Sequence, residues 1–324
     1  MSDGFGAGVG AGKGFVFRAR DRRFDRMGRL VGDDGMQRLA RSHVMVVGVG
    51  GVGSWAAESL VRSGVGTVSL VDFDDVCITN FNRQLHAVEG RVGEPKAGVM
   101  AERMRQINPA ADVRVLACFY SAETASDILS CRPDFVIDAI DCVTSKCHLL
   151  TECRSRGIRV VCSTGSGGRL DPTRIAVADL SETDVDPLAR AVRRMLRRDH
   201  GFPSEGEGLF GIPAVFSSEP AAMPRELAYD NGLGFRCVCA KGNNGLMNCD
   251  ERTLILGYAS FVTGAFGLHC AALVVCGLLE TLPGSTDVDT GTFRERCRCP
   301  APTGKPATPM GVSSNPPCNL NPEP

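Results

Sequence analysis

Four closely spaced glycines are the first feature of the sequence that could do chemistry. They overlap the end of an apolar segment at 43–49 and precede a helical segment: Gly48, Gly50, Gly51 and Gly53. In a strand–glycine–helix order, backbone N–H groups at the helix N-terminus bind anions, and glycine lets a phosphate approach the backbone closely. Asp72 follows about 20 residues on, where a carboxylate accepts hydrogen bonds from ribose hydroxyls. The pattern predicts a nucleotide site and leaves open whether it takes NAD or ATP.

Two basic residues beyond this loop favour a triphosphate. Arg83 can contact phosphate oxygens with two parallel hydrogen bonds, and Lys96 supplies a point charge at the start of a helical segment. An oxidoreductase that uses a dinucleotide has no need of this pair, and nothing resembles an acid–base pair for hydride transfer. Asp141 follows a further apolar segment and could hold Mg²⁺ through a carboxylate oxygen. Together these residues predict binding of ATP and Mg²⁺.

A run of arginines further along the chain is a second candidate site. The arginines recur at helical spacing and would share one helix face: Arg190, Arg193, Arg194, Arg197 and Arg198. On a chain with a formal net charge of −1, such a face can track the phosphate backbone of RNA. The alternative is a solvated face that only aids solubility.

Alternating strands and helices must position these residues. Apolar segments at 43–49, 67–71, 113–117, 134–140 and 158–162 are expected strands, and 55–63, 94–107 and 143–156 are expected helices. Continuous apolar strands alternating with amphipathic helices predict an α/β fold, a Rossmann-like, mostly parallel sheet with helices on both faces. Ligands of such sheets bind at the carboxyl ends of the strands.

The sequence divides into one folded domain and two tails. The domain is expected at 22–280, between a glycine-rich tail at 1–21 and a proline-rich tail at 281–324, both expected to be disordered. An uncharged stretch at 253–279 is long enough to span a bilayer. Its small residues and its place at the end of the domain favour a helix buried on the sheet or on a dimer partner.

The compartment can be inferred from the first residues and the cysteines. Residues 1–20 lack the apolar core of a secretory signal, and a chain of 324 residues does not need its 15 cysteines as disulfide staples. We therefore expect reduced thiols and a cytoplasmic protein. A mitochondrial leader, suggested by arginines at 18, 20, 22 and 23, and membrane association through 253–279 are the alternatives.

Longer segments around the candidate residues resemble one superfamily. GVGGVGSWAAESL (48–60), VDFDDVCITNFNRQ (71–84) and VIDAIDCVTSK (136–146) resemble the ThiF/MoeB superfamily, whose members are related to ubiquitin-activating enzymes and adenylate carboxylates with Mg-ATP on a Rossmann-like fold. The resemblance implies a phosphate loop at the four glycines, a ribose ligand at Asp72, ATP contacts at Asn80 and Gln84, a triphosphate clamp of Arg83 and Lys96, and a metal ligand at Asp141.

The same resemblance extends to the start of the domain. RFDRMGRL (23–30) resembles the N-terminal arginine motif of the superfamily, which places Arg26 or Arg29 near the γ-phosphate, as part of the catalytic set with Arg83, Lys96 and Asp141. Because members usually form homodimers, this arginine could belong to the partner protomer.

Within the superfamily, the chain resembles the tRNA threonylcarbamoyladenosine dehydratase subgroup. Segments 167–198 and 215–219 carry this resemblance, and the paired C-x-x-C zinc motifs of other members are absent. The resemblance implies a tRNA substrate bearing threonylcarbamoyladenosine. Its threonyl carboxylate would be activated by ATP as an acyl-adenylate, which cyclises with loss of AMP. A homodimer and a sulfur-relay protein partner are also implied.

Two other functions stay open at this point. An enzyme that activates a ubiquitin-like or sulfur-carrier protein would adenylate a C-terminal glycine and often pass it to a cysteine. Cys237, Cys239 and Cys249 are candidates for that role, against the simpler reading of ordinary cysteines in a cysteine-rich chain. The second alternative is an inactive nucleotide-binding scaffold, which the presence of Arg83, Lys96 and Asp141 argues against.

Overall fold

The computed structural model describes residues 22–228 and 255–279, and seven strands within them form one sheet. The strands are β1 (His43–Val47), β2 (Thr67–Val71), β3 (Asp112–Leu116), β4 (Phe135–Asp138), β5 (Arg159–Ser163), β6 (Ile175–Asp179) and β7 (Pro213–Ser217). Their order is β3-β2-β1-β4-β5-β7-β6, and every neighbouring pair is parallel except β6 and β7. The expected Rossmann-like, mostly parallel α/β sheet is confirmed.

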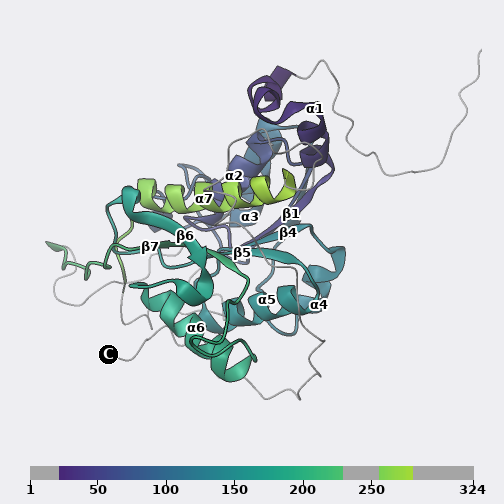
Figure 1. Cartoon of the computed structure of the whole chain (residues 1–324). Coiled ribbons are helices and arrows are strands. Elements are labelled where there is room, and N and C mark those ends of the chain that lie inside the picture. Colours follow the sequence, from purple (N-terminus) through teal and green to yellow (C-terminus); the bar gives the residue numbers. More distant parts are fainter. Residues whose placement is uncertain (1–21, 229–254, 280–324) are drawn as a thin grey trace, which may run out of the picture.

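Helices cover both faces of this sheet (Figure 1). On one face lie α1 (Asp25–Arg41), α2 (Gly53–Arg62), α3 (Lys96–Ile107) and α7 (Ser260–Leu279); on the other lie α4 (Ala125–Ile128), α5 (Val143–Ser155) and α6 (Pro187–Asp199). Each layer encloses its own cluster of buried apolar side chains. Two covered faces explain why the central strands read as continuous apolar runs.

The order of the strands creates a natural ligand site between β1 and β4. The chain runs from β1 outward to β2 and β3, then returns to the other side of β1 with β4 and β5. Ligands of open α/β sheets bind at the carboxyl ends of the strands where the order reverses. The glycine loop leaves β1 at this point, and the segment that carries Asp141 leaves β4 beside it.

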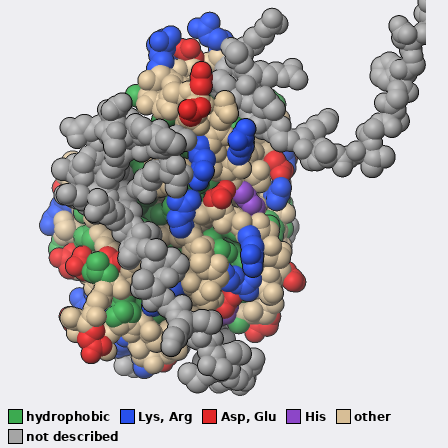
Figure 2. Space-filling model, turned by 45° about the vertical axis from the view of Figure 1, so that its right-hand side comes forward, with side chains coloured by type: hydrophobic (Ala, Val, Ile, Leu, Met, Phe, Trp, Pro, Cys, Tyr) green, Lys and Arg blue, Asp and Glu red, His purple; other side chains and the backbone are tan. Residues whose placement is uncertain are grey.

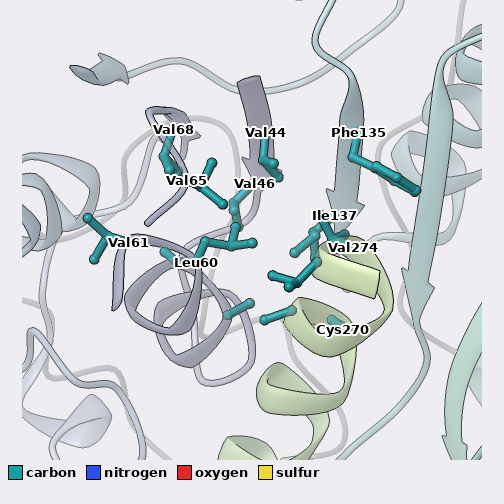
Figure 3. Close-up of a cluster of buried hydrophobic side chains, with 14 of the residues drawn as sticks. Val44, Val46, Leu60, Val61, Val65, Val68, Phe135, Ile137, Cys270 and Val274 are labelled. Carbon is teal, nitrogen blue, oxygen red and sulfur yellow. The ribbon is translucent and has the colours of Figure 1, made fainter. Parts of the chain in front are cut away.

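Close packing of α7 against α2 and the sheet builds the core beneath that loop. Figure 3 shows Val44 and Val46 of β1 and Ile137 of β4 between Leu60 of α2 and Val274 of α7. The contact depends on small residues of α7, because a Cβ atom at Gly267 would lie 2.8 Å from Trp55 Cβ.

The apolar helix α7 is a core helix in this structure. Within the part of the chain that the structure describes, it is the single helix long and apolar enough to cross a membrane, but 67% of its most apolar window is buried in the protein. The expectation of a helix buried on the sheet is therefore confirmed. Insertion into a bilayer would require that packing to be broken.

The strands β6 and β7 extend the sheet beyond the five strands expected from the sequence. They pair as an antiparallel edge although α6 separates them along the chain. The tails expected at 1–21 and 281–324, and the cysteines at 237, 239 and 249, lie outside the described residues.

Candidate active site

The glycine loop combines two glycines that the fold requires with one that leaves space. Gly48 has a φ of 89°, and a Cβ atom there would lie 2.7 Å from the Ala139 carbonyl oxygen. A Cβ atom at Gly53 would collide with the Gly48 carbonyl oxygen. At Gly50, by contrast, the nearest atom to an added Cβ is Gln84 Nε2, at 3.9 Å. The loop can therefore accept a group close to the backbone at Gly50, at the N-terminus of α2.

Asp72 is fixed next to this loop by backbone hydrogen bonds. The Val49 N–H donates to Asp72 Oδ2 over 2.6 Å, and the Asp74 N–H donates to Oδ1 over 2.8 Å. Burial raises the pKa of Asp72, which the charge of Lys96 opposes and that of Asp74 reinforces. Each carboxylate oxygen keeps a second lone pair, so ribose hydroxyls can still donate to it.

Lys96 is buried and held among carboxylates. It begins α3, and its Nζ lies 2.6 Å from Asp74 Oδ2. Burial disfavours its charge, but Asp72, Asp74 and Asp141 outweigh that effect and raise the pKa of Lys96. The structure thus brings three of the predicted site residues, Asp72, Lys96 and Asp141, within electrostatic range of one another. Asp74 is a member of the site that the sequence did not single out.

Arg83 lies across the glycine loop. Its Cγ and Cδ lie 3.3 Å from the position of a Cβ at Gly51, and its guanidinium stacks 4.7 Å from the ring centroid of Tyr258. Nη1 also donates to the Thr79 carbonyl oxygen over 2.8 Å. These contacts hold the side chain across the loop and fix the guanidinium in one orientation against Tyr258; such a fixed position suits a phosphate contact.

The segment around Arg83 carries three buried polar side chains: Asn80, Gln84 and His86. Asn80 Oδ1 accepts the Cys77 N–H over 3.0 Å, so its oxygen serves the local turn. Gln84 Oε1 and both ring nitrogens of His86 are buried and have no hydrogen-bond partner among the residues that the structure describes. Burial, aided by the charges of Lys96 and Arg103, lowers the pKa of His86 to about 3. Because buried polar groups normally have partners, Gln84 beside Gly50 fits a bound polar ligand such as a nucleotide.

Asp141 is exposed on the segment that follows β4. A buried ion pair anchors this segment: Lys146 Nζ lies 2.7 Å from Asp138 Oδ2 and 2.9 Å from the Ser163 carbonyl oxygen. Across the described ranges, no group of three or more His, Cys, Asp or Glu residues could hold a metal ion alone. Mg²⁺ at nucleotide sites is usually held by one or two carboxylates together with phosphates. A lone Asp141 fits that kind of site.

The cysteines near the site do not behave as free nucleophiles. Cys142 is disulfide-bonded, so the expectation of reduced thiols fails at this position. The other cysteines of the described segments are free thiols. Burial raises the pKa of Cys147 and of Cys270 to about 12, so both stay protonated and unreactive at neutral pH.

Two predicted catalytic residues lie away from this site in their own chain. Arg26 and Arg29 are exposed on the first turns of α1. Phe24, just before them, packs 3.6 Å from the Cβ position of Gly64, which precedes β2. They therefore lie towards the amino ends of the strands, whereas the glycine loop lies at the carboxyl ends.

The five arginines of α6 are brought together as expected. All of them line one hollow of about 770 Å³ between α6 and the segment 181–185. The sequence predicted their common face but not the opposite wall, because that wall comes from residues before the helix.

Comparison with known proteins identifies what the chain resembles. A model of the ThiF family matches residues 24–279. The tRNA threonylcarbamoyladenosine dehydratase of Haemophilus influenzae is 41% identical over 80% of the chain and 94% of its own length. The Escherichia coli enzyme of the same name is 43% identical over 76% of the chain and 89% of its own length. The crystal structure of the E. coli dehydratase TcdA in complex with ATP superposes with a TM-score of 0.68 at 39% identity, over 79% of the chain and 93% of that structure.

Proposed function

The chain belongs to the ThiF family, and from this membership we propose that it catalyses the ATP-dependent dehydration of threonylcarbamoyladenosine in tRNA. Two bacterial relatives that carry this name match over 94% and 89% of their own length. The observation that carries the proposal is the space that the loop leaves at Gly50, beside the Gln84 side chain, whose Oε1 has no partner among the described residues. The structure of a similar dehydratase in complex with ATP supports nucleotide binding by this fold.

The proposed reaction has two steps. The threonyl carboxylate of the modified adenosine attacks the α-phosphorus of ATP, the bond to the β-phosphate breaks, and pyrophosphate leaves. The adjacent carbamoyl group then attacks the activated carbonyl, loses a proton and expels AMP. The product is a ring that contains one water fewer than the substrate. Because the second nucleophile is already part of the substrate, the protein needs to supply positioning and charge neutralisation.

Each site residue has a role in this proposal. The backbone around Gly50 and Gly51 binds phosphate, and Asp72 accepts hydrogen bonds from the ribose. Arg83 and Lys96 neutralise negative charge on the phosphates, while Asn80 and Gln84 orient the nucleotide. No cysteine forms a covalent intermediate in this scheme.

Mg²⁺ belongs to the proposal through Asp141. The exposed carboxylate next to the ligand edge fits a cation that phosphate oxygens also hold. When bound, the cation would offset charge on the phosphates.

Assembly and location are further parts of the proposal. We infer a homodimer in which Arg26 or Arg29 reaches the γ-phosphate bound by the partner protomer, because neither faces the site of its own chain. A sulfur-relay protein is a further partner that the family membership suggests. The tRNA substrate places the enzyme in a compartment with tRNA, for which we propose the cytoplasm.

ATP–pyrophosphate exchange with purified protein tests the function. The additions are tRNA with threonylcarbamoyladenosine, the same tRNA without the modification, and proteins that end in Gly-Gly. Exchange with the modified tRNA alone, reduced at least about a hundredfold in Arg83→Ala, is the expected result. Exchange with a Gly-Gly protein would instead indicate activation of a ubiquitin-like protein. ATP binding without any exchange would indicate a scaffold.

A further inference from the structure

The hollow beside α6 concentrates positive charge on a chain that is otherwise nearly neutral. Five arginines line it against three carboxylates, Glu182, Asp184 and Glu205. On the face shown in Figure 2, by comparison, basic and acidic side chains are interspersed. With a formal net charge of −1 over the chain, a local excess of arginine favours an anionic partner.

The arginines of this hollow are not equivalent. Arg198 makes two hydrogen bonds of 2.6 Å to the carboxylate of Asp199, and Arg197 lies 4.0 Å from Glu205 and over the ring of Phe210. Within residues 22–228 and 255–279, no hydrogen bond or ion pair involves the guanidinium group of Arg190 or Arg194. Arg190 and Arg194 therefore carry the guanidinium groups that can accept a new partner.

Arg193 lies between Arg190 and Arg194 in the sequence and is hydrogen-bonded to the opposite wall of the hollow, the segment 181–185. Its Nη1 donates to Thr183 Oγ1 over 2.5 Å, and that hydroxyl donates to the Leu180 carbonyl oxygen over 2.9 Å. Burial and the like charges of Arg197 and Arg190 lower the pKa of Arg193. Burial is the larger cause, and the part that comes from the neighbouring arginines is a repulsion that a bound phosphate would offset.

A buried ion pair joins this part of the hollow to the ligand edge of the sheet. Asp186, the N-cap of α6, accepts the Gly165 N–H over 3.3 Å, and Gly165 follows β5 closely in the chain. Asp186 Oδ2 also lies 2.7 Å from Arg169 Nη2, and both side chains are buried. Arg190 therefore begins the basic face at the carboxyl edge, where the glycine loop and Asp141 also lie.

We propose that the hollow is a binding site for the phosphate backbone of RNA, with Arg190, Arg193 and Arg194 as the contact residues. The inference rests on the proposed function, since it concerns how the tRNA substrate is held while its modified base reaches the nucleotide site. Guanidinium groups bind phosphate oxygens in pairs and independently of base sequence. The site therefore contributes affinity and orientation, and the modified nucleoside supplies specificity.

Binding of fluorescently labelled, unmodified tRNA at several salt concentrations tests this site. The double variant Arg190→Gln/Arg194→Gln removes two exposed, unpaired charges and should fold normally. We expect its affinity for tRNA to fall on the order of tenfold near physiological salt, and the slope of log K against log salt to fall by about 2. The matched control is Arg198→Gln, whose charge is already paired with Asp199 and which should change affinity by less than about twofold.

Other outcomes separate this inference from the proposed function. Wild-type protein that releases AMP with modified tRNA, together with an unchanged salt slope in the double variant, would overturn the site and leave the function intact. Loss of binding to an acidic peptide with unchanged tRNA binding would assign the hollow to a protein partner instead. If the wild-type chain does not bind tRNA at all, both proposals fail. ATP affinity of the double variant is measured in parallel to verify an intact nucleotide site.

Discussion

The charge of Lys96 is set by the carboxylates around it. Burial alone would favour the neutral amine, yet Asp72, Asp74 and Asp141 raise the pKa of Lys96 above its usual value. Its ammonium is therefore present at neutral pH and is already paired with Asp74. A triphosphate would compete with Asp74 for it, which makes Asp74 a residue that tunes the strength of the clamp.

His86 is the residue from which we expect the clearest pH dependence of folding stability. Its pKa is lowered to about 3 in the folded chain, mainly by burial, whereas an unfolded histidine titrates near pH 6.5. Between these values the unfolded chain binds a proton that the folded chain does not, so stability is present above about pH 6.5 and is lost as the pH falls. We expect the stability difference between wild type and His86→Gln to shrink by about 2 kcal/mol from pH 7 to pH 5.

Urea denaturation of both proteins at several pH values measures this effect. Between pH 7 and pH 9 the difference should stay constant, because the imidazole is neutral in both states, and this range serves as the internal control. If the free energies of unfolding of the two proteins changed in parallel from pH 7 down to pH 5, His86 would be protonated in the folded chain.

The observed helices and strands agree with those expected from the sequence where both faces of the strands are buried. The expected strand 67–71 coincides with β2, and the helix expected at 143–156 with α5 to within a residue. The helix expected at 94–107 begins only at Lys96, because Pro95 occupies the N-cap position. The edge strand β6 was not predicted: its five side chains are all half-buried, and its apolar run is only four residues long, two of them alanine.

Some side chains of the site could be predicted from the sequence and others could not. Asp72, Arg83 and Lys96 could be predicted because Asp72 ends the apolar segment that follows the glycine loop, Arg83 comes soon after it, and Lys96 lies at the start of the next helical segment. Asp74 and His86 could not, because their significance comes from burial and from charges that the fold brings near. The wall opposite the α6 arginines could not be predicted either, because the spacing of residues along the sequence describes one helix at a time and not what packs against it.

The glycine loop allows folding and ligand binding to be separated by substitution. An added Cβ at Gly50 meets only Gln84 Nε2 at 3.9 Å, whereas at Gly53 it collides with the Gly48 carbonyl oxygen. Gly50→Ala should therefore unfold within about 2 °C of wild type, and Gly53→Ala should lose a few kcal/mol of stability, about 2 or more. We expect ATP affinity of Gly50→Ala to fall at least about tenfold, because the methyl group occupies the approach of phosphate to the backbone.

Thermal unfolding and calorimetric ATP titration distinguish the two variants. Gly53→Ala is the matched comparison, since it adds the same methyl group to the same loop. Wild-type ATP affinity in a folded Gly50→Ala protein would mean that the phosphates are held elsewhere.

At the scale of the whole molecule, two of the expected catalytic arginines lie away from the glycine loop of their own chain. Arg26 and Arg29 begin α1 near the amino end of β2, and the glycine loop begins at the carboxyl end of β1. These ends are separated by about 17 Å, the length of a strand of five residues. Either the two arginines have no part in the reaction, or they act on a partner protomer. A twofold homodimer allows the second case, because each chain can lend its α1 to the other.

Mixing two inactive variants decides between these cases. Arg26→Ala/Arg29→Ala lacks the lent arginines, and Arg83→Ala lacks a contact in the receiving site. Random exchange of protomers places one intact site in each mixed dimer, so we expect AMP formation with modified tRNA to recover to about one quarter of the wild-type rate. Each variant alone, taken through the same exchange, is the control. Arginines that act within their own chain would give no recovery, because each protomer of the mixed dimer would still lack either its own two arginines or its own Arg83. Full activity of Arg26→Ala/Arg29→Ala by itself would remove both residues from the mechanism.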